Sequence, residues 1–246
     1  MYRLHDSGRS LNSFAACGCG FFVQSRLMTN AVTYLFRLES GDEHRFDVDL
    51  DRPAAQSAGG LPGWTALAQN SCPHCPLPKT PGAVCPAAAD LAPVVKRFSA
   101  LASIVRAEVR VITAVREVRK DTDIQTALSG LMGLILATGG CPILRRLRPL
   151  AQTHLPFLTE TEMVYRMAAM QLLGCFLRGE PASFDGLHHF FDDLDTLDKA
   201  FAERLRTAAE KDASLNALMV LHARAMIASL SIDQELDRIR GWFTPG

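Results

Sequence analysis

The stretch NAVTYLFRLESGDEHRFDVDL, residues 30–50, carries the clearest structural pattern in this chain of 246 residues. It holds two runs of period-two alternation, separated by the glycine-containing segment ESGDE. This pattern predicts a β-hairpin with one buried face. The apolar residues expected on that face are Val32, Tyr34, Phe36 and Leu38 in the first run and Phe46, Val48 and Leu50 in the second.

A third run, over residues 103–117, places Val105, Val109 and Val111 opposite arginine and glutamate side chains. We expect one long strand here, which completes a small antiparallel sheet with the hairpin. A helix remains the alternative, because the tail AVREVRK loses the alternation. The predicted fold class is therefore α+β, with the N-terminal hairpin and one long strand packed on a mainly helical C-terminal half.

Helical patterns fill the chain from residue 121 onward. A first helix is expected over residues 122–138, ended by Gly139 and Gly140. A second opens at a threonine cap and ends at Gly179, and a third is capped by Ser183. The last restarts at Asp212 or Ser214, and a short helix earlier in the chain is expected to open at Asp90 and Pro93.

The domain organisation follows from where these patterns begin. Residues 1–27 show no periodicity, so we expect a poorly ordered extension, or a true start at Met28. Deleting this segment should leave the melting temperature within a few degrees. Residues 28–246 are expected to form a single α+β domain, with a Cys/Pro-rich loop at 71–86 and a helical region at 121–246.

The composition limits which partners and which cellular compartment are expected for the protein. Acidic and basic residues balance at 26 each, which gives no electrostatic reason to expect nucleic acid or an anionic lipid surface. The longest apolar run, residues 128–140, is too short to span a bilayer, so no membrane association is expected. Seven cysteines without an export signal predict a cytoplasmic, reducing location.

Proline follows four of the seven cysteines, three of them in SCPHCPLPKTPGAVCP (residues 71–86) and one at Cys141. With proline near 5% of residues, chance would give this about a few times in ten thousand. The segment cannot be a regular helix or a central strand. A proline after a metal ligand would fix the direction of the chain and lower the entropy lost on binding.

Cys72, Cys75, Cys85 and Cys141 are therefore predicted to bind one metal centre. The two-residue spacing of Cys72 and Cys75 lets both thiolates reach one ion, and four thiolates suit tetrahedral zinc or an iron–sulfur cluster. The sequence does not decide between these cofactors. The arginines Arg145, Arg146 and Arg148 follow Cys141 and are candidates to offset the negative charge of such a site.

Three other interpretations of the cysteines remain open. CPHC is also the active-site tetrapeptide of periplasmic thiol oxidases, although PLPKTPG after it forbids the helix that such a site needs. Cys-Pro with a nearby histidine could instead bind haem through a thiolate, as in a sensor. The plainest alternative is a surface loop with inert thiols. Cys17, Cys19 and Cys175 are not expected to take part in a metal site.

Several other polar groups are weaker candidates. His74 could replace a cysteine as a metal ligand, but a solvent-facing turn residue is the simpler interpretation. HHFFDDLD, residues 188–195, could place His188 with Asp192, and His189 with Asp193, although a solvated helix face explains it as well. In HLPFLTETEMVYR, an acid–base role near the cysteines is conceivable for His154, Glu160, Glu162, Tyr165 and Arg166. Glu162 and Arg166 are expected to pair on the helix surface.

The chain resembles an uncharacterised bacterial protein family. The resemblance rests on an N-terminal hairpin followed by the segments CPHCPL, GCP, LRPL and HLPF and then by E and YR. The resemblance covers most of residues 30–180 and implies no activity or ligand. The function expected from the residues is a binding or adaptor protein with an unknown protein or small-molecule partner, stabilised by the four-cysteine site. The alternatives are an iron–sulfur electron-transfer protein and a haem-binding sensor. Whether the protein is an enzyme stays open, since no phosphate loop, nucleophile elbow or dinucleotide fingerprint occurs.

Overall fold

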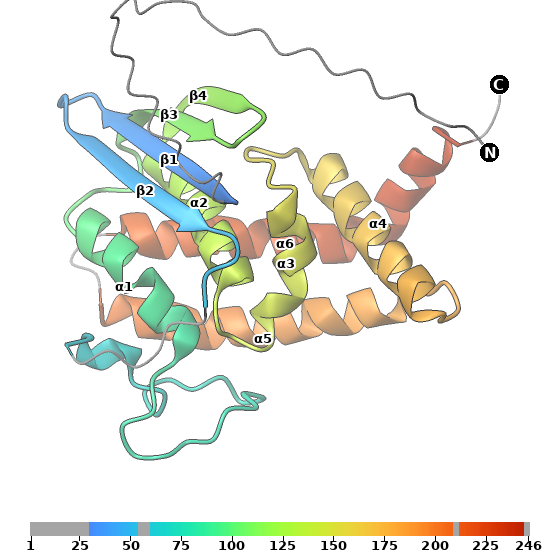
Figure 1. Ribbon diagram of the computed structural model, residues 1–246, viewed down its shortest axis with the longest axis horizontal. Coiled ribbons are helices and arrows are strands. Elements are labelled where there is room, and N and C mark those ends of the chain that lie inside the picture. The colour runs from blue at the N-terminus through green and yellow to red at the C-terminus, as the bar shows by residue number, and fades with distance from the viewer. Residues whose placement is uncertain (1–29, 54–59, 209–211, 244–246) are drawn as a thin grey trace, which may run out of the picture.

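A computed structural model describes residues 30–53, 60–208 and 212–243. Its N-terminal part is a four-stranded antiparallel sheet in the order β2-β1-β3-β4 (Figure 1). The strands are β1 (Ala31–Leu38), β2 (Glu43–Asp49), β3 (Arg106–Ile112) and β4 (Glu117–Asp123). The rest of the chain is mainly helical, so the predicted α+β class is confirmed.

The hairpin of β1 and β2 has the predicted buried face. Tyr34 lies opposite Phe46 in β2 and opposite Val111 in β3, which aligns the apolar positions of three strands. Phe36 is buried with its ring centroid 5.3 Å from that of Phe98 in the helix that covers the sheet. A one-residue slip would turn these side chains to solvent, so burial of the face fixes the register.

The single strand expected over residues 103–117 is instead the start of a second hairpin. β3 ends at Ile112, the Thr113 N–H bonds the Arg116 carbonyl at 2.9 Å, and β4 begins at Glu117. β4 is an edge strand in which Thr122 alone is buried. Apolar alternation therefore disappears where the chain turns, although the strand pairing continues.

The helices are α1 (Pro86–Phe98), α2 (Ile124–Thr138), α3 (Arg148–Gln152), α4 (Glu160–Arg178), α5 (Asp185–Arg206) and α6 (Ala213–Arg240), with 3₁₀ turns η1 (Gly63–Thr65) and η2 (Leu144–Leu147). α4 begins with the predicted capping box between Thr159 and Glu162 and ends at Gly179, whose φ is +68°. α5 begins at Asp185 and has no side-chain cap; Ser183 Oγ accepts a bond from the Asp185 N–H just before it.

α1 starts earlier than the sequence predicted. It begins at Pro86, directly after Cys85, rather than at Asp90 or Pro93. Pro86 suits a helix start because its missing N–H would have no helical partner there. Pro93 lies inside the helix and costs it one hydrogen bond. The residues before it, 71–85, contain no helix and no strand of the sheet, as predicted.

α1 and α2 cover the buried face of the sheet, and α5 and α6 run lengthwise beneath them (Figure 1). α4 lies at the end of the molecule away from α1 (Figure 1). α2 is buried along most of its length, as expected for residues 128–140. No helix in the described ranges is long and apolar enough to cross a membrane. The prediction for residues 1–27 lies outside the described residues.

Candidate functional site

The Cys72–Cys75 turn is held by the loop on either side of it. The Cys75 N–H bonds the Cys72 carbonyl at 3.1 Å, which closes the CPHC turn. Leu67 N–H bonds the Ala83 carbonyl at 2.8 Å, and an isolated bridge joins Ala66 to Val84. These contacts draw the two arms of the loop together, so both sulfurs lie partly buried at its base.

Cys85 occupies the N-cap position of α1 and is buried. Its own N–H bonds the Thr65 carbonyl at 2.8 Å, which fixes the residue against η1. Burial raises the pKa of its thiol, whereas the backbone N–H groups of Ala88 and Ala87 and the charge of Arg204 act in the opposite direction. The first turn of α1 therefore directs unpaired N–H groups at this sulfur.

Cys141 follows the two glycines that end α2. Asp90 of α1 accepts bonds from the Gly140 N–H at 3.3 Å and from Arg52 at 3.0 Å, and thereby holds this chain reversal. A Cβ at Gly139 would collide with the Asp90 carboxylate, which explains the glycine. Burial raises the pKa of Cys141, while the N–H groups of Leu144 and Ile143 act against that rise.

All four predicted cysteines line one small cavity of about 20 Å³. The pKa of Cys72 is raised to about 12, first by burial and then by its neighbours Cys85, Cys75 and Cys141. The cavity lining and this mutual effect both place the four cysteines around one small space. No group of three or more His, Cys, Asp or Glu side chains in the described ranges is arranged to hold a metal ion as it stands. The structure thus brings the cysteines together without completing a coordination sphere.

Arg204 of α5 lines the same cavity and is only 2% exposed. Its guanidinium donates to the carbonyl oxygens of Trp64 at 2.7 Å, Ala66 at 2.6 Å and Asn70 at 3.3 Å. In the described part of the chain it has no carboxylate partner, so a buried cation stands beside four ionisable thiols. Sequence reasoning missed Arg204; the available signal was a charge three residues after Phe201, on the apolar face of the helix.

The arginines that follow Cys141 do not line this cavity. Arg146 pairs with Asp193 at 3.1 Å and stacks over the Phe190 ring, and Arg148 pairs with Asp51 at 3.2 Å. Arg145 is exposed. The cation beside the cysteines is instead Arg204, from a segment more than fifty residues further along the chain.

The weaker ligand candidates lie elsewhere. His74 points toward Asp193 at 3.9 Å and does not line the cysteine cavity. His188 and His189 are exposed, and the phenylalanines that follow them are buried, as a solvated helix face requires. Cys175 is buried in α4 beside Gln171, away from the four cysteines. Cys17 and Cys19 lie outside the described residues.

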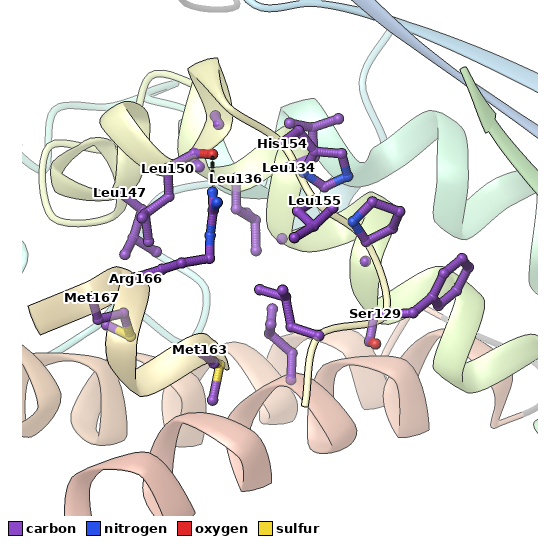
Figure 2. A pocket seen from close by; sticks show the side chains of 18 of the residues that line it. Ser129, Leu134, Leu136, Leu147, Leu150, His154, Leu155, Met163, Arg166 and Met167 are labelled. Atoms are coloured by element: carbon purple, nitrogen blue, oxygen red, sulfur yellow. Dashed lines mark hydrogen bonds between the residues drawn. The ribbon is translucent and has the colours of Figure 1, made fainter. Parts of the chain in front are cut away.

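A second, larger cavity of about 350 Å³ lies between α2, α4 and the segment 144–159 (Figure 2). Its walls are mostly apolar and include Leu134, Leu147, Leu150, Leu155, Met163 and Met167. His154, Glu160 and Arg166 also line it, so these three candidates meet at this cavity and not at the cysteines. Glu162 belongs to the α4 capping box, and Tyr165 is exposed beside Trp242.

The expected surface pair of Glu162 and Arg166 does not form. The Glu162 carboxylate accepts from the Thr159 N–H at 2.7 Å, so it is already committed to the helix cap. Arg166 Nη2 instead donates to the Thr153 carbonyl at 2.9 Å, the Thr153 hydroxyl at 3.0 Å and the Leu150 carbonyl at 3.3 Å. Figure 2 shows this side chain reaching from α4 toward Leu150.

His154 is neutral in this cavity. Its Nε2 shares a 2.8 Å hydrogen bond with the hydroxyl of buried Tyr34. Burial, followed by the positive charge of Arg166, lowers the pKa of His154 to about 4. Asp198, also on the cavity wall, bonds His222 Nδ1 at 3.0 Å, and burial raises the pKa of this carboxyl to about 6.

A family profile described as a domain of unknown function (DUF6901) matches residues 32–244, which is most of the chain. The chain belongs to the DUF6901 family. This agrees with the resemblance to an uncharacterised family noted from CPHCPL and the segments after it. Searches of curated proteins and of solved structures found no match to this DUF6901 protein.

Proposed function

We propose that this DUF6901 protein is a non-enzymatic binding protein whose fold is stabilised by one zinc ion bound to Cys72, Cys75, Cys85 and Cys141. The observation that carries the proposal is that all four cysteines line one small cavity beside buried Arg204. Four protein ligands leave no open position on tetrahedral zinc, which is the pattern of structural rather than catalytic sites.

The surroundings of the cysteines suit thiolates bound to a cation. Without a cation, burial favours the protonated thiols of Cys72, Cys85 and Cys141, whose pKa values it raises. A bound divalent cation would displace the thiol protons, and the complex of one such cation with four thiolates would carry a net charge of about −2. Arg204 offsets part of that charge, and the N–H groups at the starts of α1 and η2 face Cys85 and Cys141. Such outer contacts orient ligands and tune the metal.

The size of the cavity favours one ion over an iron–sulfur cluster. About 20 Å³ is close to the space that a single water molecule requires, whereas a cluster adds several iron and sulfide atoms between the thiolates. Haem needs far more room than this cavity offers. The raised pKa of Cys72 argues against a thiol oxidase, whose attacking cysteine needs a lowered pKa, and α1 starts after Cys85 rather than after Cys72.

Metal analysis tests the proposal directly. The full chain, purified anaerobically without chelators, should be colourless and contain one zinc per chain. Changing any of the four cysteines to Ser should lower the zinc content and the melting temperature. Cys175→Ser is the matched control and should retain the zinc, since this buried cysteine lies away from the cavity.

Two results would contradict this assignment. Brown protein that absorbs near 400 nm and contains iron would favour the electron-transfer alternative. Protein that folds equally well with no bound metal, and with each of the four cysteines replaced, would identify them as inert thiols.

A further inference from the structure

Arg166 lies at the wall of the apolar cavity and has no carboxylate partner among the described residues. Among the described residues, its guanidinium hydrogen bonds all come from one nitrogen, Nη2, and their acceptors are carbonyl and hydroxyl oxygens. Nε and Nη1 form no hydrogen bond within the described part of the chain. By contrast, Arg146 and Arg178, which line another hollow, pair with Asp193 and Glu180.

The electrostatic surroundings of Arg166 favour an anion. Burial lowers the pKa of Arg166, and the nearby positive charge of Arg116 lowers it further, against the opposing effect of Glu162. Neutral His154 lies close enough to respond to the charge of Arg166. In Figure 2 the Arg166 guanidinium and the His154 ring lie on one side of the cavity, whereas Met163 lies on the other.

The remaining polar groups of the cavity do not supply that anion to Arg166. Asp198 is bonded to His222, and Ser129 Oγ donates to the Thr126 carbonyl within α2. Glu160 also lines the cavity and has an interaction of its own, and among the described residues no ion pair joins it to Arg166. The cavity therefore combines a largely apolar wall with one donor-rich, positively charged region, which is the usual composition of a small-molecule site.

We propose that this cavity binds a small amphiphile with an apolar chain and a carboxylate head, the head held by Arg166 with His154 beside it. The apolar chain would contact the leucine and methionine side chains of the wall, which leave about 350 Å³. A carboxylate fits because it accepts strong, charge-assisted hydrogen bonds from guanidinium N–H groups. The inference deepens the proposed binding function by naming its ligand class, and it does not depend on the identity of the metal.

Calorimetric titration of the full chain with four ten-carbon probes tests the head group without any mutation. The probes are decanoate, 1-decanol, decylamine and decyl phosphate, which share an apolar chain. We expect decanoate to bind about tenfold or more tightly than 1-decanol, and decylamine to bind most weakly. Equal affinities for decanoate and 1-decanol would overturn the proposal. Tighter binding of decyl phosphate would overturn the assignment of the head as a carboxylate.

Two substitutions in one helix locate the head group. Arg166→Gln should remove the preference for decanoate over 1-decanol and leave the binding of 1-decanol largely unchanged. Arg178→Gln is the matched control, because this α4 arginine pairs with Glu180 and lies outside the cavity. An Arg166→Gln protein that still prefers decanoate would contradict the proposed role of Arg166.

A third substitution locates the apolar chain of the ligand. Met163→Trp should fill part of the cavity and weaken decanoate and 1-decanol alike. Unchanged binding of both would place the ligand elsewhere and contradict the proposal. Zinc is measured on the same samples, which separates the two proposals. Protein that contains zinc but does not bind decanoate would refute this inference alone. Protein that lacks zinc but binds decanoate more tightly than 1-decanol would refute the metal proposal alone.

Discussion

At the scale of single residues, the contact between Tyr34 and Gly130 joins the sheet to the wall of the apolar cavity. Tyr34 is fully buried, and its hydroxyl shares a hydrogen bond with His154. A Cβ at Gly130 would lie 2.9 Å from that hydroxyl oxygen, so only glycine fits at this point of α2. The glycine weakens the helix by about 1 kcal/mol relative to alanine, and the close approach of Tyr34 accounts for it.

We predict that Gly130→Ala lowers the free energy of unfolding by about 1–3 kcal/mol, because the added methyl group displaces the Tyr34 hydroxyl. Adding Tyr34→Phe to this variant should recover part of the loss, since it removes the atom that collides. Chemical denaturation measures both effects. Gly133→Ala is the matched control: its Cβ would meet Leu221 at 3.5 Å, an ordinary contact, so its stability should not fall. Equal losses at the two glycines would rule out the proposed collision.

His154 should make stability depend on pH. Its pKa is about 4 in the folded chain, against an ordinary value of 6.5, so between these values the unfolded chain binds the proton and the folded chain does not. Stability is therefore lost as pH falls through this window. From pH 7 to pH 5 the contribution of His154 is about 2 kcal/mol. Denaturation curves of wild type and His154→Gln should diverge by this amount.

The comparison with the variant is needed because other groups titrate in the same range. The raised pKa of Asp198 acts in the opposite direction, since the folded chain then holds a proton that the unfolded chain releases. Contributions shared by both proteins cancel in the difference between them. Parallel stability profiles for wild type and His154→Gln would show that His154 is not held neutral by the fold.

At the scale of elements, α5 contributes to both candidate sites. Leu197, Phe201 and Arg204 line the cysteine cavity, whereas Leu194 and Asp198 line the apolar cavity. Three- and four-residue spacings place each set along one side of the helix. α5 therefore forms part of the wall of both cavities.

Arg204→Met tests the charge that α5 brings to the cysteines. Methionine keeps much of the side-chain volume but removes the cation and its bonds to the carbonyls of Trp64, Ala66 and Asn70. We expect the free energy of unfolding to fall by at least about 2 kcal/mol. The affinity for zinc, measured by competition with a chelator, should also fall by about tenfold or more. Arg206→Gln, two residues further on and exposed in a pair with Glu203, should do neither. Unaltered zinc retention in Arg204→Met would exclude a role for this charge.

The elements that could be predicted from sequence are those with a strong local signal. The β1–β2 hairpin alternates cleanly because one face is buried, and α4 shows its cap and its terminal glycine in the sequence. β4 was missed because an edge strand with one buried residue has no apolar period. The start of α1 was missed because a proline after cysteine resembles loop sequence, although the same proline suits the first turn of a helix.

The candidate sites, too, could be predicted from sequence only where a local pattern exists. The four cysteines were grouped from spacing and from the prolines that follow them, and the structure places them around one cavity. Arg204 and the apolar cavity are products of tertiary packing. The cavity walls come from α2, α4, α5, α6 and the segment 144–159, each of which shows ordinary core residues in sequence. No local pattern indicates that such residues leave space between them.

At the scale of the whole molecule, the two cavities are linked by a short piece of chain. Cys141 and Ile143 lie at the cysteine cavity, and Leu144 and Leu147 of η2 lie at the apolar one. The loop 71–86 is brought to this point from a different part of the sequence, so a metal bound to the four cysteines would fasten the segment that leads into η2 to this loop and to the start of α1. An ion at one cavity would in this way fix part of the wall of the other.

Because this segment adjoins both cavities, zinc and decanoate should affect each other's affinity although they make no contact. If zinc orders η2, zinc-loaded protein should bind decanoate more tightly than chelated protein, by about fivefold or more. Decanoate must then strengthen the retention of zinc by the same factor, because the four states form a closed thermodynamic cycle. Calorimetry with and without zinc, and chelator competition with and without decanoate, measure the two sides of the cycle. If the affinity for decanoate is the same with and without zinc, η2 is ordered without the metal, and binding at the two cavities is not coupled.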